Sequence, residues 1–327
     1  MTETTMGAAV VETLGSAPTF QEIPRPTPKA DQVLIQIGAA GLNPIDLRIA
    51  SGTFYGGAPD VPYVPGSEGV GIVVDGSTEL KGERVRFETA RGTSGALAEW
   101  TVAAPQSCLP LPAELDTATA AGVGVAGIAA WICLVDKVQL KAGESVLILG
   151  ATGAVGQVAV QIAKLLGAGR IVAAGRDPGA LAKTLDLGAD AVVTIADQSP
   201  DTIRQELMDA AGGPLNVIFD PVWGRPLEDA IGATAQSARV IHLGESAGSD
   251  ATLSSATVRG RQLTIIGHAS PQTPWETRAR AFNEVADHAA AGRIRLSLEE
   301  MPLSEISSAW QRQADSPHIK LVLIPAL

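Results

Sequence analysis

Short apolar runs alternate with helical patterns through the middle of the chain. The runs are rich in Val, Ile and Ala and predict strands at residues 145–150, 170–175, 191–195, 216–222, 238–244 and 262–268. Helical periodicity predicts helices between the first of these strands, at residues 156–166, 179–187 and 202–211. Strands that alternate with helices of about 10–15 residues indicate βαβ units, and therefore a parallel sheet with right-handed crossovers.

The first third of the chain shows a different pattern, dominated by β-branched and alternating segments. These segments predict strands at residues 32–38, 69–75, 83–88 and 96–102. An Ala- and Gly-rich helical stretch follows at residues 117–135, and the tail predicts a helix at 277–291, a short strand, a helix at 304–312 and a strand at 320–324. The change of pattern after Asp116 indicates a boundary between two domains.

The composition is that of a globular protein. Of the 327 residues, 46% are hydrophobic and 18% are charged, and a chain of this length suits two domains. The formal net charge of -11 repels phosphate backbones and anionic lipids, so we expect no nucleic acid and no membrane as partners. The apolar runs at residues 145–149 and 321–325 are shorter than a membrane span.

The only two cysteines, Cys108 and Cys133, lie in apolar surroundings and are not closely spaced. We expect them to be buried free thiols rather than a disulfide. Free thiols fit a reducing compartment, so the expected location is the cytoplasm.

A glycine turn follows the strand predicted at residues 145–150. It reads Gly-Ala-Thr-Gly-Ala-Val-Gly and leads directly into the next helix, which is the context that a dinucleotide site requires. Glycine lets the backbone approach a pyrophosphate, and the unpaired N–H groups at the helix start attract its charge. The candidate cofactor residues here are Gly150, Thr152, Gly153, Ala154, Val155 and Gly156. The alternative is a tight turn that binds nothing.

The end of the second strand of this domain distinguishes NADPH from NADH. An NAD site places an acidic residue about 20 positions after the glycines, where it binds the ribose hydroxyl. Here Gly175 is followed by Arg176, 20 residues after Gly156. A guanidinium can bind the 2′-phosphate of NADPH through two hydrogen bonds. Asp177 precedes Pro178, which predicts a helix N-cap rather than a ribose ligand. The sequence favours NADPH, with a solvated Arg176 as the alternative.

Several further segments, together with the glycine turn, carry a family resemblance. They are Gly-Leu-Asn-Pro-Ile-Asp at 41–46, Tyr-Val-Pro-Gly-Ser-Glu-Gly-Val-Gly at 63–71, Gly-Glu-Arg-Val at 82–85, Ala-Leu-Ala-Glu-Trp-Thr-Val at 96–102 and Leu-Gly-Ala-Asp at 187–190. In this order they resemble the zinc-independent quinone oxidoreductases of the medium-chain dehydrogenase/reductase superfamily. The resemblance implies an α/β fold, with a GroES-like β domain from residues 1–118 and 269–327 and a doubly wound Rossmann NADPH-binding domain from 119–268.

The resemblance also bears on metal binding. Zinc alcohol dehydrogenases of the superfamily carry a ligand cysteine where this chain has Asn43 and a ligand histidine where it has Ser67. Glu68 alone cannot complete a tetrahedral set, so no metal site is expected. Without a Lewis acid to stabilise an alkoxide, the expected reaction is hydride transfer to a quinone or an α,β-unsaturated carbonyl.

The resemblance places two residues of the first domain in the active site. Asn43 would lie by the nicotinamide and hydrogen-bond either a substrate carbonyl or the cofactor ribose. Tyr55 would lie on a loop that reaches the pocket, where it would either donate a proton or pack as a loop aromatic.

Further cofactor contacts are expected where strands end, because ligands bind at the carboxyl edge of such sheets. These residues are Asp220, Val222, Leu243, Gly244 and His268. Among the four histidines we expect only His268 near this site, and a structural or surface role for the others, His242 included.

Two other functions stay open. One is a tailoring enoyl or ketone reductase of a biosynthetic pathway, and the other is an NADPH-binding protein with low turnover and a regulatory or structural role. The family expectation for assembly is a homodimer formed through the sixth strand of the nucleotide domain, near residues 262–268.

Overall fold

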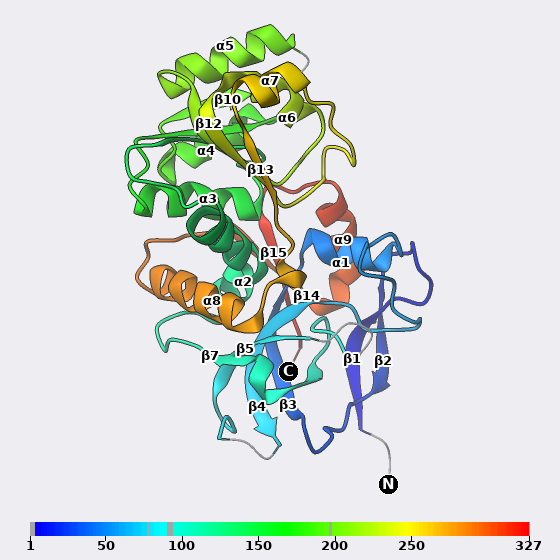
Figure 1. Cartoon of the computed structure of the whole chain (residues 1–327). Coiled ribbons are helices and arrows are strands. Elements are labelled where there is room, and N and C mark those ends of the chain that lie inside the picture. The colour runs from blue at the N-terminus through cyan, green and yellow to red at the C-terminus, as the bar shows by residue number, and fades with distance from the viewer. Residues whose placement is uncertain (1–3, 77–78, 90–93, 196–197, 327) are drawn as a thin grey trace. The chain divides into compact units, whose positions relative to one another are not determined.

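The computed structural model describes residues 4–76, 79–89, 94–195 and 198–326, which form two compact units (Figure 1). The first unit comprises Met1–Val125, Ala286–Ala291 and Leu296–Leu327, and the second comprises Ala126–Val285 and Gly292–Arg295. Helix α8 (Trp275–Ala290) lies largely in the second unit, where Arg280 pairs with Asp136 at 2.9 Å. The units therefore divide after residues 125 and 285. The family domain boundaries expected after 118 and 268 stay a prediction.

The second unit contains a sheet of six parallel strands in the order β10-β9-β8-β11-β12-β13. This order places the first strand along the chain, β8, beside both the second and the fourth, so the order of the strands switches from one side of β8 to the other there. The predicted parallel sheet is confirmed, and all six predicted strands are present within a few residues. Their bounds are Ser145–Ile148 (β8), Arg170–Gly175 (β9), Ala191–Thr194 (β10), Leu215–Asp220 (β11), Thr234–His242 (β12) and Thr264–Gly267 (β13).

The helices between these strands start at residues that cap them well. In α4 (Pro178–Asp186) the N-cap is Asp177, whose Oδ1 accepts a hydrogen bond from Ala180 N at 2.7 Å, as the sequence predicts. In α5 (Pro200–Ala211) Ser199 caps the start, and the buried residues recur at helical spacing. The remaining helices of this region are α3 (Ala154–Leu165), α6 (Arg225–Ala230) and α7 (Ser255–Gly260).

The first unit is built on an antiparallel sheet. Its strand order is β14-β15-β3-β4-β5-β7, with β6 also paired to β3 and only the β14–β15 pair parallel. A separate hairpin-like pair, β1 and β2, adds two strands that the sequence did not predict. The bounds are Thr5–Val10 (β1), Thr19–Pro24 (β2), Val33–Gly41 (β3), Glu68–Asp75 (β4), Arg84–Glu88 (β5), Trp100–Ala103 (β6), Cys108–Pro110 (β7), Leu298–Pro302 (β14) and Lys320–Ile324 (β15).

The strand predicted at 96–102 is present only from Trp100. Before it, Ala96 N and Leu97 N donate to Gly66 O and Pro65 O, and the backbone then forms a single antiparallel bridge to β1, between Ala98 and Ala8, instead of a continuous strand. The apolar side chains that suggested a strand are buried in the core of the first unit. Two helices complete this unit, α1 (Pro44–Ala50) and α9 (Ile306–Ala314).

Helix α2 (Thr117–Trp131) starts in the first unit and continues, through the π-helical turn Ile132–Lys137, in the second. Among the described residues, only this run, Thr117–Lys137, is long and apolar enough to cross a membrane by length and composition. It is longer than the apolar runs at residues 145–149 and 321–325, and the sequence did not predict it as a candidate span. Because 83% of the apolar window is buried inside the protein, the run has the burial of a core helix. Cys108 and Cys133 are buried free thiols, as expected.

Candidate cofactor and active site

The glycine turn has the strand–turn–helix geometry that the sequence predicts. Gly150 adopts φ +58°, in the left-handed region, and Gly153 is the N-cap of α3. A Cβ at Gly156 would lie 2.3 Å from Gly150 O and 2.6 Å from the Cα of Ala151, so only glycine fits where the helix crosses the turn. A Cβ at Gly153 would meet no atom closer than 3.5 Å, which leaves its backbone approachable by a ligand.

The start of α3 suits a negatively charged group. Ala154 and Val155 occupy its first turn, where backbone N–H groups lack partners within the helix and the helix dipole is positive. Thr152 is buried beside this turn, and its carbonyl accepts a hydrogen bond from Gln157 Nε2 at 2.8 Å. The turn is thereby fixed in a shape that can hold a pyrophosphate.

The end of β9 lies next to the glycine turn. A Cβ built on Gly175 would lie 3.6 Å from Thr152 Cγ2, so the two segments are neighbours. The Arg176 side chain is exposed, and we find no hydrogen bond or ion pair for it in the described parts of the chain. The carboxylate of Asp177 is engaged at the helix start instead. Arg176 is therefore the side chain at this strand end that has its donors available for a ligand.

Asp220 ends β11 as a fully buried carboxylate. Its Oδ1 accepts hydrogen bonds from Val222 N at 3.0 Å and Trp223 N at 2.8 Å, which fixes the turn after the strand. Its Oδ2 lies 3.4 Å from Nδ1 of His242, the residue paired with it across β11 and β12. The indole of Trp223 packs on the same imidazole, with 4.1 Å between ring centroids.

The next strand ends lie close to this turn. A Cβ at Gly150 would meet Val222 Cγ1 at 2.8 Å, and a Cβ at Gly244 would meet Pro221 O at 2.5 Å. Leu243 N donates to Asp220 O. The structure thus brings the sequence-predicted residues of the second unit together at one edge of the sheet. Whether they contact a cofactor stays a prediction.

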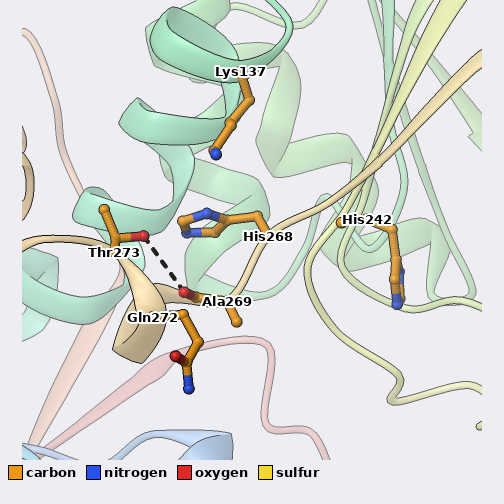
Figure 2. A pocket seen from close by; sticks show the side chains of 7 residues that line it. Lys137, His242, His268, Ala269, Gln272 and Thr273 are labelled. Carbon is orange, nitrogen blue, oxygen red and sulfur yellow. Dashed lines mark hydrogen bonds between the residues drawn. The ribbon is translucent and has the colours of Figure 1, made fainter.

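A pocket of about 400 Å³ lies at the ends of β12 and β13 (Figure 2). Lys137, His242 and His268 are among the residues that line it, so the expectation that His268 alone among the histidines lies near this edge is wrong. The parallel register brings His242 there, and the sequence alone did not reveal that register.

Burial and the positive charge of Lys137 together lower the pKa of His268 to about 4, against an opposing effect of Asp136. The imidazole is therefore neutral at neutral pH. Its Nε2 lies 3.1 Å from Ser270 Oγ.

Asn43 lies in the first unit, at the N-terminus of α1, and is buried. Asn43 N donates to Asp46 Oδ2 at 2.9 Å, while Ser67 donates to Asp46 Oδ1 through its backbone N at 2.9 Å and its hydroxyl at 2.6 Å. Burial raises the pKa of Asp46 above its usual value, and the hydrogen bonds from Ser67 and Asn43 oppose that effect. Asp46 thus joins the start of α1 to the loop at Ser67.

Glu68 is the centre of a buried charge network. Oε2 accepts hydrogen bonds from Arg86 Nη2 at 2.9 Å and Nε at 3.3 Å, and Oε1 accepts from Val125 N at 2.7 Å and Asn43 Nδ2 at 3.3 Å. Arg86 also pairs with Glu88 at 2.9 Å. Each carboxylate oxygen of Glu68 therefore accepts two hydrogen bonds, and all four donors belong to this chain.

Lys320 was not predicted as part of the site. It is the first residue of β15, and its Nζ donates to Leu42 O at 3.0 Å and Asn43 Oδ1 at 2.6 Å. Burial lowers the pKa of this lysine, and the negative charges of Glu68 and Asp46 counteract the effect. The sequence does carry one signal of this buried cluster, a pair of glycines, Gly122 and Gly124, inside a helical stretch.

Tyr55 follows α1 in a loop. Its side chain is 68% exposed and packs on Phe54, with 4.3 Å between ring centroids. Its catalytic role stays a prediction.

The residues at the zinc positions do not fit Zn²⁺. Asn43 and Ser67 carry an amide and a hydroxyl where zinc relatives have a thiolate and an imidazole. The neighbouring Glu68 is already bound to a guanidinium. Within the part of the chain that the structure describes, no cluster of three or more His, Cys, Asp or Glu residues is arranged to hold a metal ion.

Comparisons with known proteins agree with this architecture. Residues 29–140 match the alcohol dehydrogenase GroES-like domain, and residues 154–287 match the zinc-binding dehydrogenase domain, which confirms the predicted fold class. Human quinone oxidoreductase is 40% identical over 162 residues, 48% of each chain, so the match spans about half of that relative. Quinone oxidoreductase of Lama guanicoe is 35% identical over 227 residues, 67% of this chain and 66% of the relative.

A solved mycobacterial structure, described as complexed with NADPH, has the same fold. It is 23% identical, with a TM-score of 0.87 over 98% of this chain and 100% of that one. Together with the glycine turn and the two matched domains, these similarities show that the chain belongs to the medium-chain dehydrogenase/reductase superfamily and is quinone oxidoreductase-like.

Proposed function

We propose that the protein is an NADPH-dependent oxidoreductase that transfers hydride to a quinone or an α,β-unsaturated carbonyl without zinc. The observation that carries the proposal is the exposed Arg176 at the end of β9, beside the glycine turn. The pyrophosphate would lie on the turn Gly150–Gly156 and the start of α3, and the guanidinium of Arg176 would bind the 2′-phosphate.

The bound nicotinamide supplies the hydride, and the protein supplies orientation. A quinone gains this hydride and a proton to become a hydroquinone. An enone gains the hydride at its β-carbon and the proton at its α-carbon. Tyr55, in its exposed loop, is the proposed proton source, with solvent as the alternative.

The absence of a metal from the proposed reaction rests on the donor set. Asp46 and Glu68 are the carboxylates near the zinc positions, and both are occupied by donors of this chain. An already electrophilic acceptor can take a hydride without a Lewis acid, whereas a metal ion assists alcohol oxidation by stabilising the alkoxide.

Consumption of NADPH and NADH with a panel of quinones, enones and aldehydes tests this function, together with the dissociation constant of each cofactor. We expect turnover with quinones or enones, a preference for NADPH, and no loss of activity after treatment with a metal chelator. Equal affinity for the two cofactors would remove the role of Arg176. Binding without turnover would favour a regulatory or structural protein. Turnover confined to a ketone or an enoyl thioester would favour a tailoring reductase.

The remaining partner that we propose is a second copy of the chain, joined at β13. This edge strand packs mainly against its neighbour β12. The opposite edge strand, β10, also packs against the helices α4 and α5. Ile265 on β13 is 39% exposed. An uncovered edge strand is a template for pairing with another chain.

We expect Ile265→Lys to convert a dimer into a monomer, because a charge on the strand disfavours edge-to-edge pairing. The matched control is Val192→Lys on β10, where the side chain is 37% exposed. Light scattering coupled to size exclusion reports the mass of each variant. A dimer that survives Ile265→Lys, or that is lost in Val192→Lys, contradicts this interface.

A further inference from the structure

The pocket of about 400 Å³ at the ends of β12 and β13 lies wholly within the second unit. Its polar lining consists of Lys137, His242, His268, Gln272 and Thr273, and small residues complete it. No carboxylate is among the described residues that line it, although the chain has a formal net charge of -11. A cation-bearing hollow on an acidic protein favours anions locally.

Lys137 is the source of positive charge in this pocket. It ends the π-helical turn Ile132–Lys137, its side chain is exposed, and we find no hydrogen bond or ion pair for it in the described parts of the chain. Figure 2 shows the side chain extending toward the imidazole of His268. Burial and the charge of Lys137 lower the pKa of His268 to about 4, so this imidazole adds no charge at neutral pH. The ammonium therefore keeps its donors and its charge available for a ligand.

Two carboxylates lie near the pocket, and both have other partners. Asp136, which acts electrostatically on His268, pairs with Arg280 at 2.9 Å. Asp220 is fully buried and does not line the pocket. Its Oδ1 accepts hydrogen bonds from two backbone N–H groups of the following turn, and its Oδ2 faces Nδ1 of His242 at 3.4 Å. Neither carboxylate neutralises Lys137 by direct pairing.

His242 is held in a fixed orientation on the β12 side of the pocket. Trp223 adopts φ +58°, a conformation rare for a bulky residue, and its indole packs on the imidazole with 4.1 Å between ring centroids. Asp220 Oδ2 has no hydrogen-bond partner in the described residues, so we assign the imidazole proton to the facing Nδ1. Nε2 is then left as an acceptor for a polar group of the ligand.

The segment after β13 supplies neutral donors. Gln272 is exposed, and we find no hydrogen bond for its side-chain amide among the described residues. Thr273 Oγ1 makes only a long contact of 3.4 Å, with Ala269 O. The backbone here is fixed, because Gln272 N donates to Ala269 O and Arg278 Nη1 donates to Thr273 O. An amide and a hydroxyl on a fixed turn suit the oxygen atoms of an anion.

We propose that this pocket binds an oxyanion, a carboxylate or a phosphate group, with Lys137 as its cation and Gln272 and Thr273 as neutral donors. The site goes beyond the proposed cofactor site, since His268 is the one residue that lines the pocket and is also an expected cofactor contact. The carboxamide of a nicotinamide is neutral and would leave the ammonium without a partner. The proposal therefore does not depend on the reductase activity.

Histidine ring signals in carbon–proton NMR spectra test the site, because the chain has only four histidines. The probes are inorganic phosphate and sodium acetate, each added at fixed pH and at an ionic strength held constant with sodium chloride. We expect saturable shifts of the His242 and His268 signals with one common dissociation constant in the millimolar range, while His288 and His318, which do not line the pocket, stay unchanged. The variants His242→Gln and His268→Gln assign the signals. Tighter binding of phosphate or of acetate identifies the preferred anion.

Lys137→Met should weaken binding of the preferred anion about tenfold or more. Lys141→Met, which removes another exposed lysine of the same unit, is the matched control and should bind as the wild type does. Thermal unfolding confirms that both variants are folded. The shifts should persist in the presence of saturating NADPH. The proposal is overturned by wild-type affinity in Lys137→Met, by an equal loss in Lys141→Met, by equal shifts of all four histidines or by no saturable shift with either anion. Loss of the shifts when NADPH is present would assign the pocket to the cofactor instead.

Discussion

Replacing Glu68 by alanine is expected to lower the free energy of unfolding by about 3–5 kcal/mol, the scale for removing one partner of a buried ion pair. The substitution leaves Arg86 buried with Glu88 as its remaining carboxylate, and it deprives Val125 N of its acceptor. It also removes one of the two negative charges that act on Lys320. Urea unfolding at neutral pH measures the loss.

The matched control is Glu88→Gln, which removes the other carboxylate on Arg86. Because the Glu88 side chain is partly exposed, water can replace it, and we expect a loss of about 1 kcal/mol or less. Equal losses of unfolding free energy in the two variants would mean that the buried network around Glu68 stabilises the fold no more than the partly exposed Glu88 does. The double variant Glu68→Ala with Arg86→Met should recover part of the stability, since it removes the unpaired charge.

Arg176→Ala is expected to weaken NADPH binding by about 1–3 kcal/mol, or roughly 5- to 150-fold, the scale of a lost charged hydrogen bond. NADH has no 2′-phosphate, so its affinity should stay within about twofold, and the preference for NADPH should vanish. Isothermal titration with each cofactor measures both constants. Because the Arg176 side chain is exposed and has no hydrogen bond or ion pair among the described residues, the variant should fold normally.

Lys183→Ala is the control for this variant, as it removes an exposed positive charge from the neighbouring helix α4. It should leave the NADPH constant nearly unchanged. A similar loss in both variants would point to general electrostatic attraction instead of a specific phosphate contact. An unchanged NADPH constant in Arg176→Ala would remove the basis of the cofactor proposal.

The strands of the parallel sheet could be predicted because they are near-continuous apolar runs with helices between them. The predicted strand at 320–324 coincides with β15, and Asp177 caps α4 as its place before Pro178 indicates. The short strands β1, β2 and β7 and the helix α1 were missed. The strand β7 and the helix α1 are too short for a clear period, and β1 and β2 are defined by their pairing with each other, which the sequence does not show.

The residues of the site also divide into those that are local in sequence and those that tertiary pairing brings together. The glycine turn and Arg176 are local in sequence, so their spacing alone suggested their role. Lys320 reaches Asn43 from 277 positions away, and only the pairing of β15 with β3 brings them together. The contact between Asp220 and His242 likewise depends on the register of two parallel strands. A single sequence carries no direct record of either pairing.

The tight approach of Gly124 to Glu68 links two positions that lie far apart in the chain. Any side chain at position 124 would displace the carboxylate that Arg86 and Asn43 share. Alanine there, which would otherwise strengthen the helix, becomes acceptable only after the carboxylate at 68 has been lost or shortened. Both single steps are therefore costly, since loss of Glu68 leaves Arg86 short of a carboxylate and a side chain at 124 displaces Glu68, so along an evolutionary path the two positions are expected to change together.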